Sequence, residues 1–356
     1  MVALSRMQMA LKSVKLPFFF LFVSVLIMPG CSSINKGEMT GFPRFSKDGD
    51  RVIMSAKCGE LRSAFFVIDI EKRKVINKYM PKSEISFGPQ YIDDKRVLYS
   101  CKKIRNVCPD YCLEDMMSGE FRRITSGGYG GKSFVFLEKK EKILFSSACI
   151  NGNLTMKKGI EEGISAKYDL FSVDIDGANR NRLTNTESYG MRGLSATRDN
   201  RRVLLYRSKH KLVPSQMWLY EVEENKLGAF VPDLSWLFRE VAEEKSIDLQ
   251  ELSSKWAKDN IYFFSISPSG NEIVFSMRFP YSTRGDGLYI ADIATGAVRN
   301  IYPLGMEVRD LAFSPDGNMI LIVEEGEDGY WNIWKINKDG SGLSEIVGGG
   351  QICKGI

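Results

Sequence analysis

The sequence predicts an all-β fold, a six-bladed β-propeller of four-stranded antiparallel blades, and three observations support this prediction. A stretch of about forty residues, Arg309 to Val347, alternates apolar runs with turn residues, as expected for consecutive strands. Similar stretches recur earlier in the chain, and repeats of this length are typical of propellers or arrays. A single sheet of four strands exposes two faces, so it needs neighbours to become stable.

The stretch that ends near Val347 shows the expected layout of one blade. A first strand, Leu311 to Phe313, meets a turn at Ser314 to Gly317 (SPDG), where Pro fixes φ and Gly supplies a positive φ. A second strand is expected at Ile320 to Val323 and an aromatic-rich third strand at Trp331 to Ile336. A second turn then leads to the last strand.

Two positions, which we call anchors, recur together in all six units. The first apolar residue of the second strand recurs at spacings of 45, 46, 60, 70 and 47 residues, as Val52, Val97, Ile143, Val203, Ile273 and Ile320. The polar residue that closes the third strand recurs as Asp69, Glu114, Asp174, Glu221, Asp292 and Asn337. Because both anchors recur together, we expect one closed ring over residues 41–350.

These units resemble the propeller repeat of TolB-like proteins, in which F-S-P-D-G precedes an apolar strand. The resemblance rests on Phe313 to Gly317 (FSPDG), Ile266 to Gly270 (ISPSG) and Phe45 to Gly49 (FSKDG). It is weaker at Phe136 to Lys140 (FLEKK) and Ser195 to Asp199 (SATRD). It covers Gly41 to about Gly350 and implies a propeller that binds an envelope protein or peptide at the mouth of its channel. The repeat specifies a fold far more than a function, because unrelated binders and accessory domains share it.

Residues 1–30 are predicted to be a lipoprotein signal peptide. Basic residues precede an apolar run from Leu16 to Ile27, which is short for a membrane-spanning helix, and Met28 to Cys31 (MPGC) follows. This resembles the bacterial lipoprotein signal, which implies acylation of Cys31, with residues 31–40 as a tether. Ser32 after the Cys implies the periplasmic face of the outer membrane. An uncleaved anchor and ordinary secretion are the alternatives.

Six cysteines remain once Cys31 is set aside, an even number that suits disulfides in an exported chain. The repeat register places all of them near one face of the ring: Cys58, Cys101, Cys108, Cys112, Cys149 and Cys353. Our hypothesis is that Cys58 pairs with Cys353 and ties the ends of the ring. The other four would link blades two and three. Isolated reduced thiols are the alternative.

Residues 232–259, after blade four, carry the helical sequence pattern of the mature chain. Leu234, Leu237, Phe238 and Val241 share one helical face. A capping box at Asp248 predicts a second helix. We expect this insertion to pack over blades four and five, with presentation of Trp236 or Trp256 to a partner as the alternative. A second insertion, residues 151–167 in blade three, is expected to be a surface loop.

Charge and composition argue against several functions. The formal net charge is +5, and Arg6, Lys12 and Lys15 of the signal segment supply three of these charges, so nothing indicates nucleic-acid binding. The chain has one histidine, His210, which rules out a site with several His ligands and leaves a Ser-His-Asp triad without support. We therefore predict no catalytic residues, no metal site and no cofactor.

Binding residues are expected around the ring axis and in one loop. By register, the starts of the innermost strands carry Arg44, Gln90, Arg192 and Arg309. The loop of blade five mixes basic and aromatic residues, a composition favoured at interfaces: Arg278, Phe279, Tyr281 and Arg284. The expected function is non-enzymatic binding of an envelope protein or peptide. The alternatives are a hydrolase or lyase that acts on a glycan in the channel, and a propeller that binds a small ligand.

Overall fold

In the computed structural model the chain divides into two units, Met1–Ile34 and Asn35–Ile356. The structure describes residues 38–57, 63–83, 85–102, 108–126, 128, 133–150, 153–154, 156–158, 164–208, 216–245, 248, 261–278, 286–326 and 330–354. All of them belong to the second unit, and no helix among them is long and apolar enough to cross a membrane.

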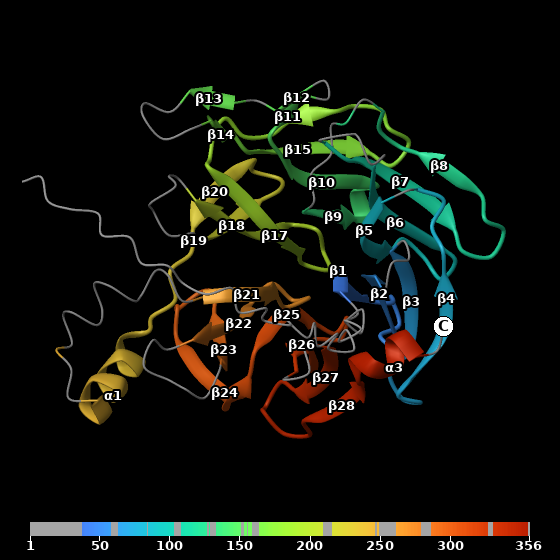
Figure 1. Cartoon of the computed structure of the whole chain (residues 1–356). Helices are drawn as coiled ribbons and strands as arrows, with labels where there is room; N and C mark the ends of the chain where they lie inside the picture. Colours follow the sequence, from blue (N-terminus) through green and yellow to red (C-terminus); the bar gives the residue numbers. More distant parts are fainter. Residues whose placement is uncertain are drawn as a thin grey trace, which may run out of the picture. The chain divides into compact units, whose positions relative to one another are not determined.

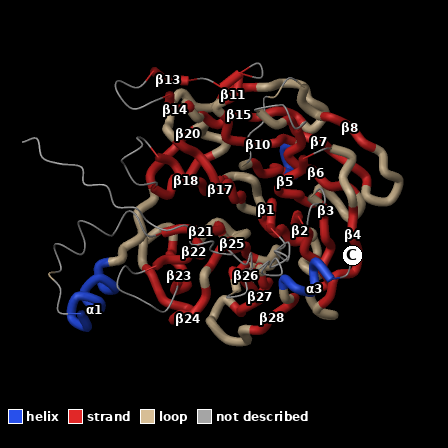
Figure 2. Tube along the Cα trace, viewed as in Figure 1, coloured by secondary structure: helices blue, strands red, loops and turns tan. Residues whose placement is uncertain are grey.

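Six four-stranded antiparallel sheets form the ring of a six-bladed propeller (Figure 1). In each four-stranded sheet the strand that comes first in the chain lies at the edge nearest the axis, and these first strands contact one another from blade to blade. Figure 2 shows that nearly all of the described chain is strand or turn. The predicted fold class is confirmed.

The first three blades take their strands from the N-terminal half of the ring. Blade one contains β1 (Glu38–Phe45), β2 (Arg51–Lys57), β3 (Ala64–Asp69) and β4 (Lys74–Tyr79). Blade two contains β5 (Ile85–Tyr91), β6 (Arg96–Lys102), β7 (Asp110–Asp115) and β8 (Phe121–Arg123). Blade three contains β9 (Phe134–Leu137), β10 (Lys142–Ser147), β15 (Asp169–Asp174) and β16 (Asn181–Arg182).

The last three blades follow the same order. Blade four contains β17 (Gly190–Ala196), β18 (Arg202–Ser208), β19 (Gln216–Glu221) and β20 (Lys226–Ala229). Blade five contains β21 (Ile261–Ile266), β22 (Glu272–Arg278), β23 (Asp286–Asp292) and β24 (Val298–Met306). Blade six contains β25 (Val308–Phe313), β26 (Met319–Glu325), β27 (Trp331–Asn337) and β28 (Ser344–Val347).

The turn that follows the first strand explains why F-S-P-D-G starts a blade. In blade six the Ser314 hydroxyl donates to Asp316 at 2.5 Å and accepts the backbone N–H of Met319 at 3.0 Å. Gly317 has φ +76°, a conformation that favours glycine. Blade one repeats these bonds with Ser46 and Asp48. The side chains thus satisfy the backbone of the turn and fix the register of the next strand.

The anchor residues occupy the expected register with one exception. Asp69 pairs with Arg51 across the ladder, and the anchors of blades three to six take the same place. In blade two Asp115, rather than Glu114, lies opposite Arg96 and accepts the N–H groups of the following turn. Glu114 was therefore assigned one residue too early. It is buried, and it accepts a hydrogen bond from the Tyr99 hydroxyl at 2.6 Å.

The described part of the chain has one apolar cluster at each junction between neighbouring blades. The six clusters each draw buried side chains from the facing sheets of two blades. Burying one Leu, Ile or Phe side chain is worth about 1.5–3 kcal/mol, so each junction is held mainly by apolar packing. This explains why no blade would be stable alone.

The ring closes at the junction of blade one with blade six, which we call the seam. Each blade is built from its own stretch of chain, so in the part of the chain that the structure describes no strand is shared between the first and last blades. Instead, Val52 and Phe66 of blade one pack with Leu321 and Ile346 of blade six. Ile352 of the short helix α3 (Gly349–Lys354) joins the same cluster.

The two insertions are more ordered than a plain loop. Helix α1 (Ser235–Lys245) places Leu237 and Phe238, and the residue before it places Leu234, in the apolar cluster shared by blades four and five, which confirms the expected packing. Trp236 packs against the same cluster. Most of the second predicted helix, with Trp256, lies outside the described residues. In blade three a 3₁₀ turn, η1 (Glu138–Lys140), follows β9. Two short hairpins form in and beside the insertion that was expected to be a surface loop: β11 (Cys149–Ile150), β12 (Asn153–Leu154), β13 (Met156–Lys158) and β14 (Ile164–Ala166).

Candidate functional site

The antiparallel blades give the ring two distinct ends. At one, which we call the turn end, lie the tight turns from first to second and from third to fourth strands. At the other, the loop end, first and third strands begin and second strands finish. The innermost strands run between the two ends, so the position of a residue along its strand decides which end it serves.

Gln90 lies in the last two residues of β5, nearer the turn end than predicted, and it joins two blades. Its amide donates to the carbonyl of Phe134 at 2.8 Å and accepts the N–H of Phe136 at 3.2 Å. The side chain is buried. Because both polar atoms of its side chain are hydrogen-bonded to the backbone of blade three, Gln90 acts as a structural link between blades two and three.

Two serines make the same kind of link in later blades, and the sequence analysis missed them. Ser195 accepts the N–H of Ile266 at 3.2 Å, and Ser265 accepts the N–H of Phe313 at 3.3 Å. Ser195 and Ser265 stand two residues before the Thr or Ser that opens the turn, as Gln90 stands near the end of β5. Their shared register was the available signal.

Arg44 also lies near the end of its strand, at the seam. Its guanidinium donates to the Asp310 carboxylate of β25 at 3.3 Å. Asp310 is buried, and burial raises the pKa of its carboxyl to about 6, a rise that the positive charge of Arg44 opposes. The pair is one charged contact across the junction of the first and last blades.

Arg309 and Arg278 are linked at the loop end through one shared carboxylate, that of Glu307. Glu307 contacts Arg309 at 2.9 Å and Arg278 at 3.5 Å, and Arg309 also pairs with Glu325. This joins one predicted residue of the ring mouth with one predicted loop residue. The other loop residues, Phe279, Tyr281 and Arg284, lie outside the described part of the chain.

Arg192 is more exposed than the other predicted arginines of the ring mouth, Arg44 and Arg309. Its guanidinium lies over the ring of Tyr206, 5.8 Å from the centroid, and no carboxylate among the described residues pairs with it. Burial raises the pKa of the Tyr206 hydroxyl, which donates to the Ile261 carbonyl at 2.5 Å. Tyr262, on the adjoining innermost strand, is 41% exposed. Arg192 and Tyr262 thus offer a cation and a phenol at the loop end.

Two disulfides reinforce the loop end of blades two and three. Cys108 pairs with Cys149 and links the two blades, as predicted. Cys101 pairs with Cys112 between β6 and β7, so this bond lies within blade two and corrects the prediction that all four cysteines link the blades. Adjacent antiparallel strands bring these two side chains together directly. Cys31, Cys58 and the side chain of Cys353 lie outside what the structure describes.

Buried aspartates brace the same region, and neither was predicted. Asp169 at the start of β15 accepts Arg182 at 2.5 Å, the Thr184 hydroxyl at 2.8 Å and the Thr186 N–H at 2.6 Å. Asp110 at the start of β7 repeats the arrangement with Arg123, Thr125 and the N–H of Gly128. Arg and Thr follow the Asp at the same two offsets in both blades, a repeat that the sequence alone displays.

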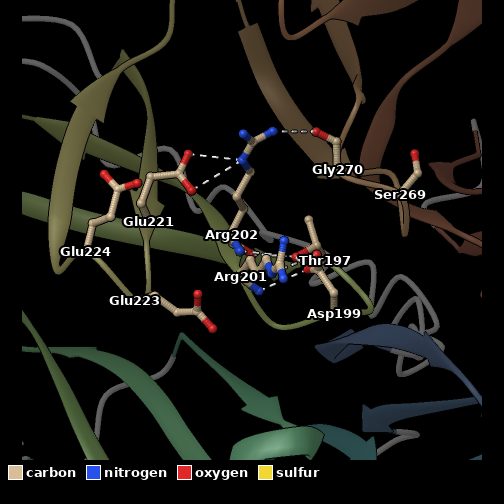
Figure 3. A pocket seen from close by; sticks show the side chains of 9 residues that line it. All are labelled: Thr197, Asp199, Arg201, Arg202, Glu221, Glu223, Glu224, Ser269 and Gly270. Carbon is tan, nitrogen blue, oxygen red and sulfur yellow. Dashed lines mark hydrogen bonds and ion pairs between the residues drawn. The ribbon is translucent and has the colours of Figure 1, made fainter.

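A shallow pocket of about 370 Å³ opens at the turn end between blades four and five (Figure 3). Its charged side chains are largely paired with one another: Arg202 contacts Glu221 at 3.0 Å and donates to the Gly270 carbonyl at 3.2 Å. Asp199 accepts the Thr197 hydroxyl at 2.6 Å. Within the described residues no group of three or more His, Cys, Asp or Glu side chains could hold a metal ion.

Comparison with known proteins gives the fold. No protein-family model matches the sequence, and no curated protein matches it. Among solved structures, TolB from Acinetobacter baumannii is 15% identical with a TM-score of 0.55, over 86% of this chain and 62% of that one, so the match covers less than two thirds of that protein. A TolB from Agrobacterium tumefaciens is 12% identical with a TM-score of 0.58, over 82% of this chain and 90% of that one.

The same fold also occurs in an enzyme. Oligogalacturonate lyase from Vibrio parahaemolyticus is 12% identical with a TM-score of 0.53, over 88% of this chain and 79% of that one. At such identities the likeness concerns the arrangement of strands and not the chemistry. The chain therefore has the six-bladed β-propeller fold seen in TolB.

Proposed function

We propose that this chain is a non-enzymatic binding protein of the cell envelope, which takes up a protein or peptide partner at the loop end of its ring. The observation that carries the proposal is Arg192, an exposed cation on an innermost strand with no carboxylate partner among the described residues. Tyr262 supplies an exposed phenol on the next blade. Arg and Tyr are the residue types that most often dominate binding energy at protein interfaces.

The contrast with the other predicted binding residues refines the site. Gln90 is bonded to the backbone, and Arg44 and Arg309 are paired with carboxylates. A partner would have to break these contacts before using those residues, whereas Arg192 contacts the Tyr206 ring and has no carboxylate partner among the described residues. We therefore place Arg192 at the centre of the proposed interface. Arg278, with Phe279, Tyr281 and Arg284 of the same loop, would contribute at its rim.

The envelope location rests on the signal segment and on the disulfides. Cys108–Cys149 and Cys101–Cys112 are buried structural bonds of a kind that persists in oxidising compartments. We propose that lipid on Cys31 tethers the ring to the periplasmic face of an outer membrane. TolB-like folds in the comparison support the same assignment.

Affinity capture from envelope extracts tests the proposal. The lipidated protein is expected to retain a stoichiometric protein partner, and Arg192→Ala is expected to lose it. Arg198→Ala is the matched control, because Arg198 is an exposed arginine of the same blade at the turn end. Equal capture by both variants, or loss with both, would contradict an interface centred on Arg192.

The alternative function is a hydrolase or lyase that acts on a glycan within the ring, or a propeller that binds a small ligand. The structural likeness to oligogalacturonate lyase supports it. The chain has a single histidine for such chemistry, His210, which lies outside the described residues. Release of unsaturated or shortened oligosaccharides from envelope glycans by the purified protein would favour this alternative over the binding role.

A further inference from the structure

The seam is the junction at which the ring could open, because no strand among the described residues is shared between the first and last blades. Its two innermost strands, β1 and β25, come from opposite ends of the propeller and are in contact. Arg44 and Asp310 bridge them with a 3.3 Å ion pair, and the two side chains are 27% and 9% exposed. A charged pair therefore lies at the junction where, among the described residues, side-chain contacts hold the first and last blades together.

The surroundings of Asp310 supply few polar partners for its charge. Arg44 on β1 is the charged side chain that acts on it among the described residues, with a backbone N–H at Leu311. On β25 and β26, Arg309 is paired with Glu307 and Glu325, and Val323 lies opposite Asp310.

Other titratable groups on the strands packed against β25 are paired or exposed. On β22, Glu272 pairs with Lys338 at 2.8 Å and Arg278 pairs with Glu307 at 3.5 Å. Glu324 of β26 accepts the Trp334 indole N–H at 2.7 Å. Strand β21, which contacts β25 from the other side, contributes Tyr262 as its titratable group, and that side chain is 41% exposed.

We propose that the Arg44–Asp310 pair makes the seam proton-sensitive: uptake of one proton by Asp310 replaces the ion pair with a neutral acid beside Arg44 and tightens the ring. The proton comes from solvent and binds a carboxylate oxygen of Asp310. Arg44 keeps its charge, so the seam gains one net positive charge. Tightening follows because a buried carboxylate with one cationic contact loses more hydration than that contact restores.

The pKa of Asp310 is consistent with a protonation change at this contact. Burial raises the pKa of Asp310 from 3.8 to about 6, so the folded ring binds the proton more tightly than the unfolded chain does. The closed seam is therefore favoured as the pH falls through 6 towards 3.8. From these two values the closed seam should gain about tenfold over the open state between pH 7.5 and pH 5.

Amide hydrogen exchange of the full ring tests the proposal. After correction for intrinsic exchange, protection of β1 and β25 should rise about tenfold from pH 7.5 to pH 5 in the wild type. The neutral variant Asp310→Asn should show no such rise. The junction of β9 with β17, between blades three and four and across the ring from the seam, is the internal control and should not show the gain.

Three results would overturn the proposal. One is a wild-type seam whose protection does not increase in acid. The second is an Asp310→Asn ring with the same acid gain as the wild type. If that variant does not fold, Arg44→Gln replaces it: removing the cation should lower seam protection at pH 7.5 and enlarge the acid gain. The third contrary result is an Arg44→Gln ring whose seam behaves like the wild type.

Discussion

Two buried aspartates, each paired with an arginine, hold different parts of the ring in different ways. Asp169 in blade three receives hydrogen bonds from Arg182, from two threonine hydroxyls and from a backbone N–H. Asp310 at the seam has Arg44 at 3.3 Å and one backbone N–H. A buried carboxylate stabilises a fold only when its oxygens are fully bonded. We infer that Asp169 stabilises blade three, whereas Asp310, with fewer hydrogen bonds to its carboxylate, destabilises the seam.

The largest effect is expected from the covalent bond beside the braced aspartates. Replacing Cys108 and Cys149 with Ser removes a disulfide that closes a loop of 41 residues. The chain-entropy relation gives a loss of about 4 kcal/mol in the free energy of unfolding. The matched double change at Cys101 and Cys112, which closes 11 residues, should cost less, about 3 kcal/mol. Urea unfolding measures both, and an inverted order would contradict the role assigned to the link between blades.

Removing the charge of the braced aspartate should come next. Asp169→Asn keeps the size of the side chain but places an amide N–H₂ among donors, so part of the bonding network is lost. We expect a loss of about 3 kcal/mol at pH 7.5, because breaking a buried, fully bonded pair costs this much. Urea unfolding provides the measurement. A neutral or stabilising result would show that Asp169 and Asp310 do not differ as we describe.

A smaller effect is expected from the serine links near the axis. Ser265→Ala removes the acceptor of the Phe313 N–H, a buried hydrogen bond worth about 1 kcal/mol. Ser269→Ala is a suitable control, since Ser269 lies in the turn of the same blade and accepts a longer bond, 3.4 Å, from Asn271. Thermal unfolding of the two variants should separate them, and equal melting temperatures would argue against a structural role for Ser265.

The smallest effect on stability is expected for Arg192, although its effect on binding should be large. Arg192→Ala removes an exposed side chain that has no carboxylate partner among the described residues, so the free energy of unfolding should change by less than about 0.5 kcal/mol. A much larger loss, measured by urea unfolding, would mean that Arg192 braces the ring and is not available to a partner.

The blade pattern could be predicted from sequence because local chemistry determines it. The apolar anchors Val52 and Ile320 begin the buried part of their strands, and Asp69 and Asn337 lie opposite the residue before each anchor. Each of these pairings joins neighbouring strands of one blade. Glu114 was misassigned because two acidic residues stand side by side, and only the ladder shows that Asp115 takes the turn.

The contacts between blades were harder to predict. Arg44 and Asp310 are 266 residues apart, and nothing in either repeat unit indicates that they meet. Gln90 was predicted to bind a ligand because its register places it near the axis, but the same register also brings it to the backbone of blade three. By contrast, the Asp–Arg–Thr repeat of blades two and three could have been found from its constant spacing.

The aspartates of the turns and the aspartate of the seam affect the stability of the ring in two separate pH ranges. Hydrogen bonds from Ser46 and Ser314 lower the pKa of Asp48 and Asp316, so the stability that these turns contribute is lost only as the pH falls below 3.8. Asp310 acts in the opposite sense and at higher pH, between 3.8 and about 6. Comparing a variant with the wild type at each pH cancels the groups that both proteins share.

The most direct measurement is therefore the difference in the free energy of unfolding between Asp310→Asn and the wild type at pH 7.5 and at pH 4.5. The account predicts that the variant is the more stable protein at pH 7.5 and that its advantage falls by about 2 kcal/mol at pH 4.5, because wild-type Asp310 is then protonated in the folded ring. A difference that is the same at both pH values would contradict it.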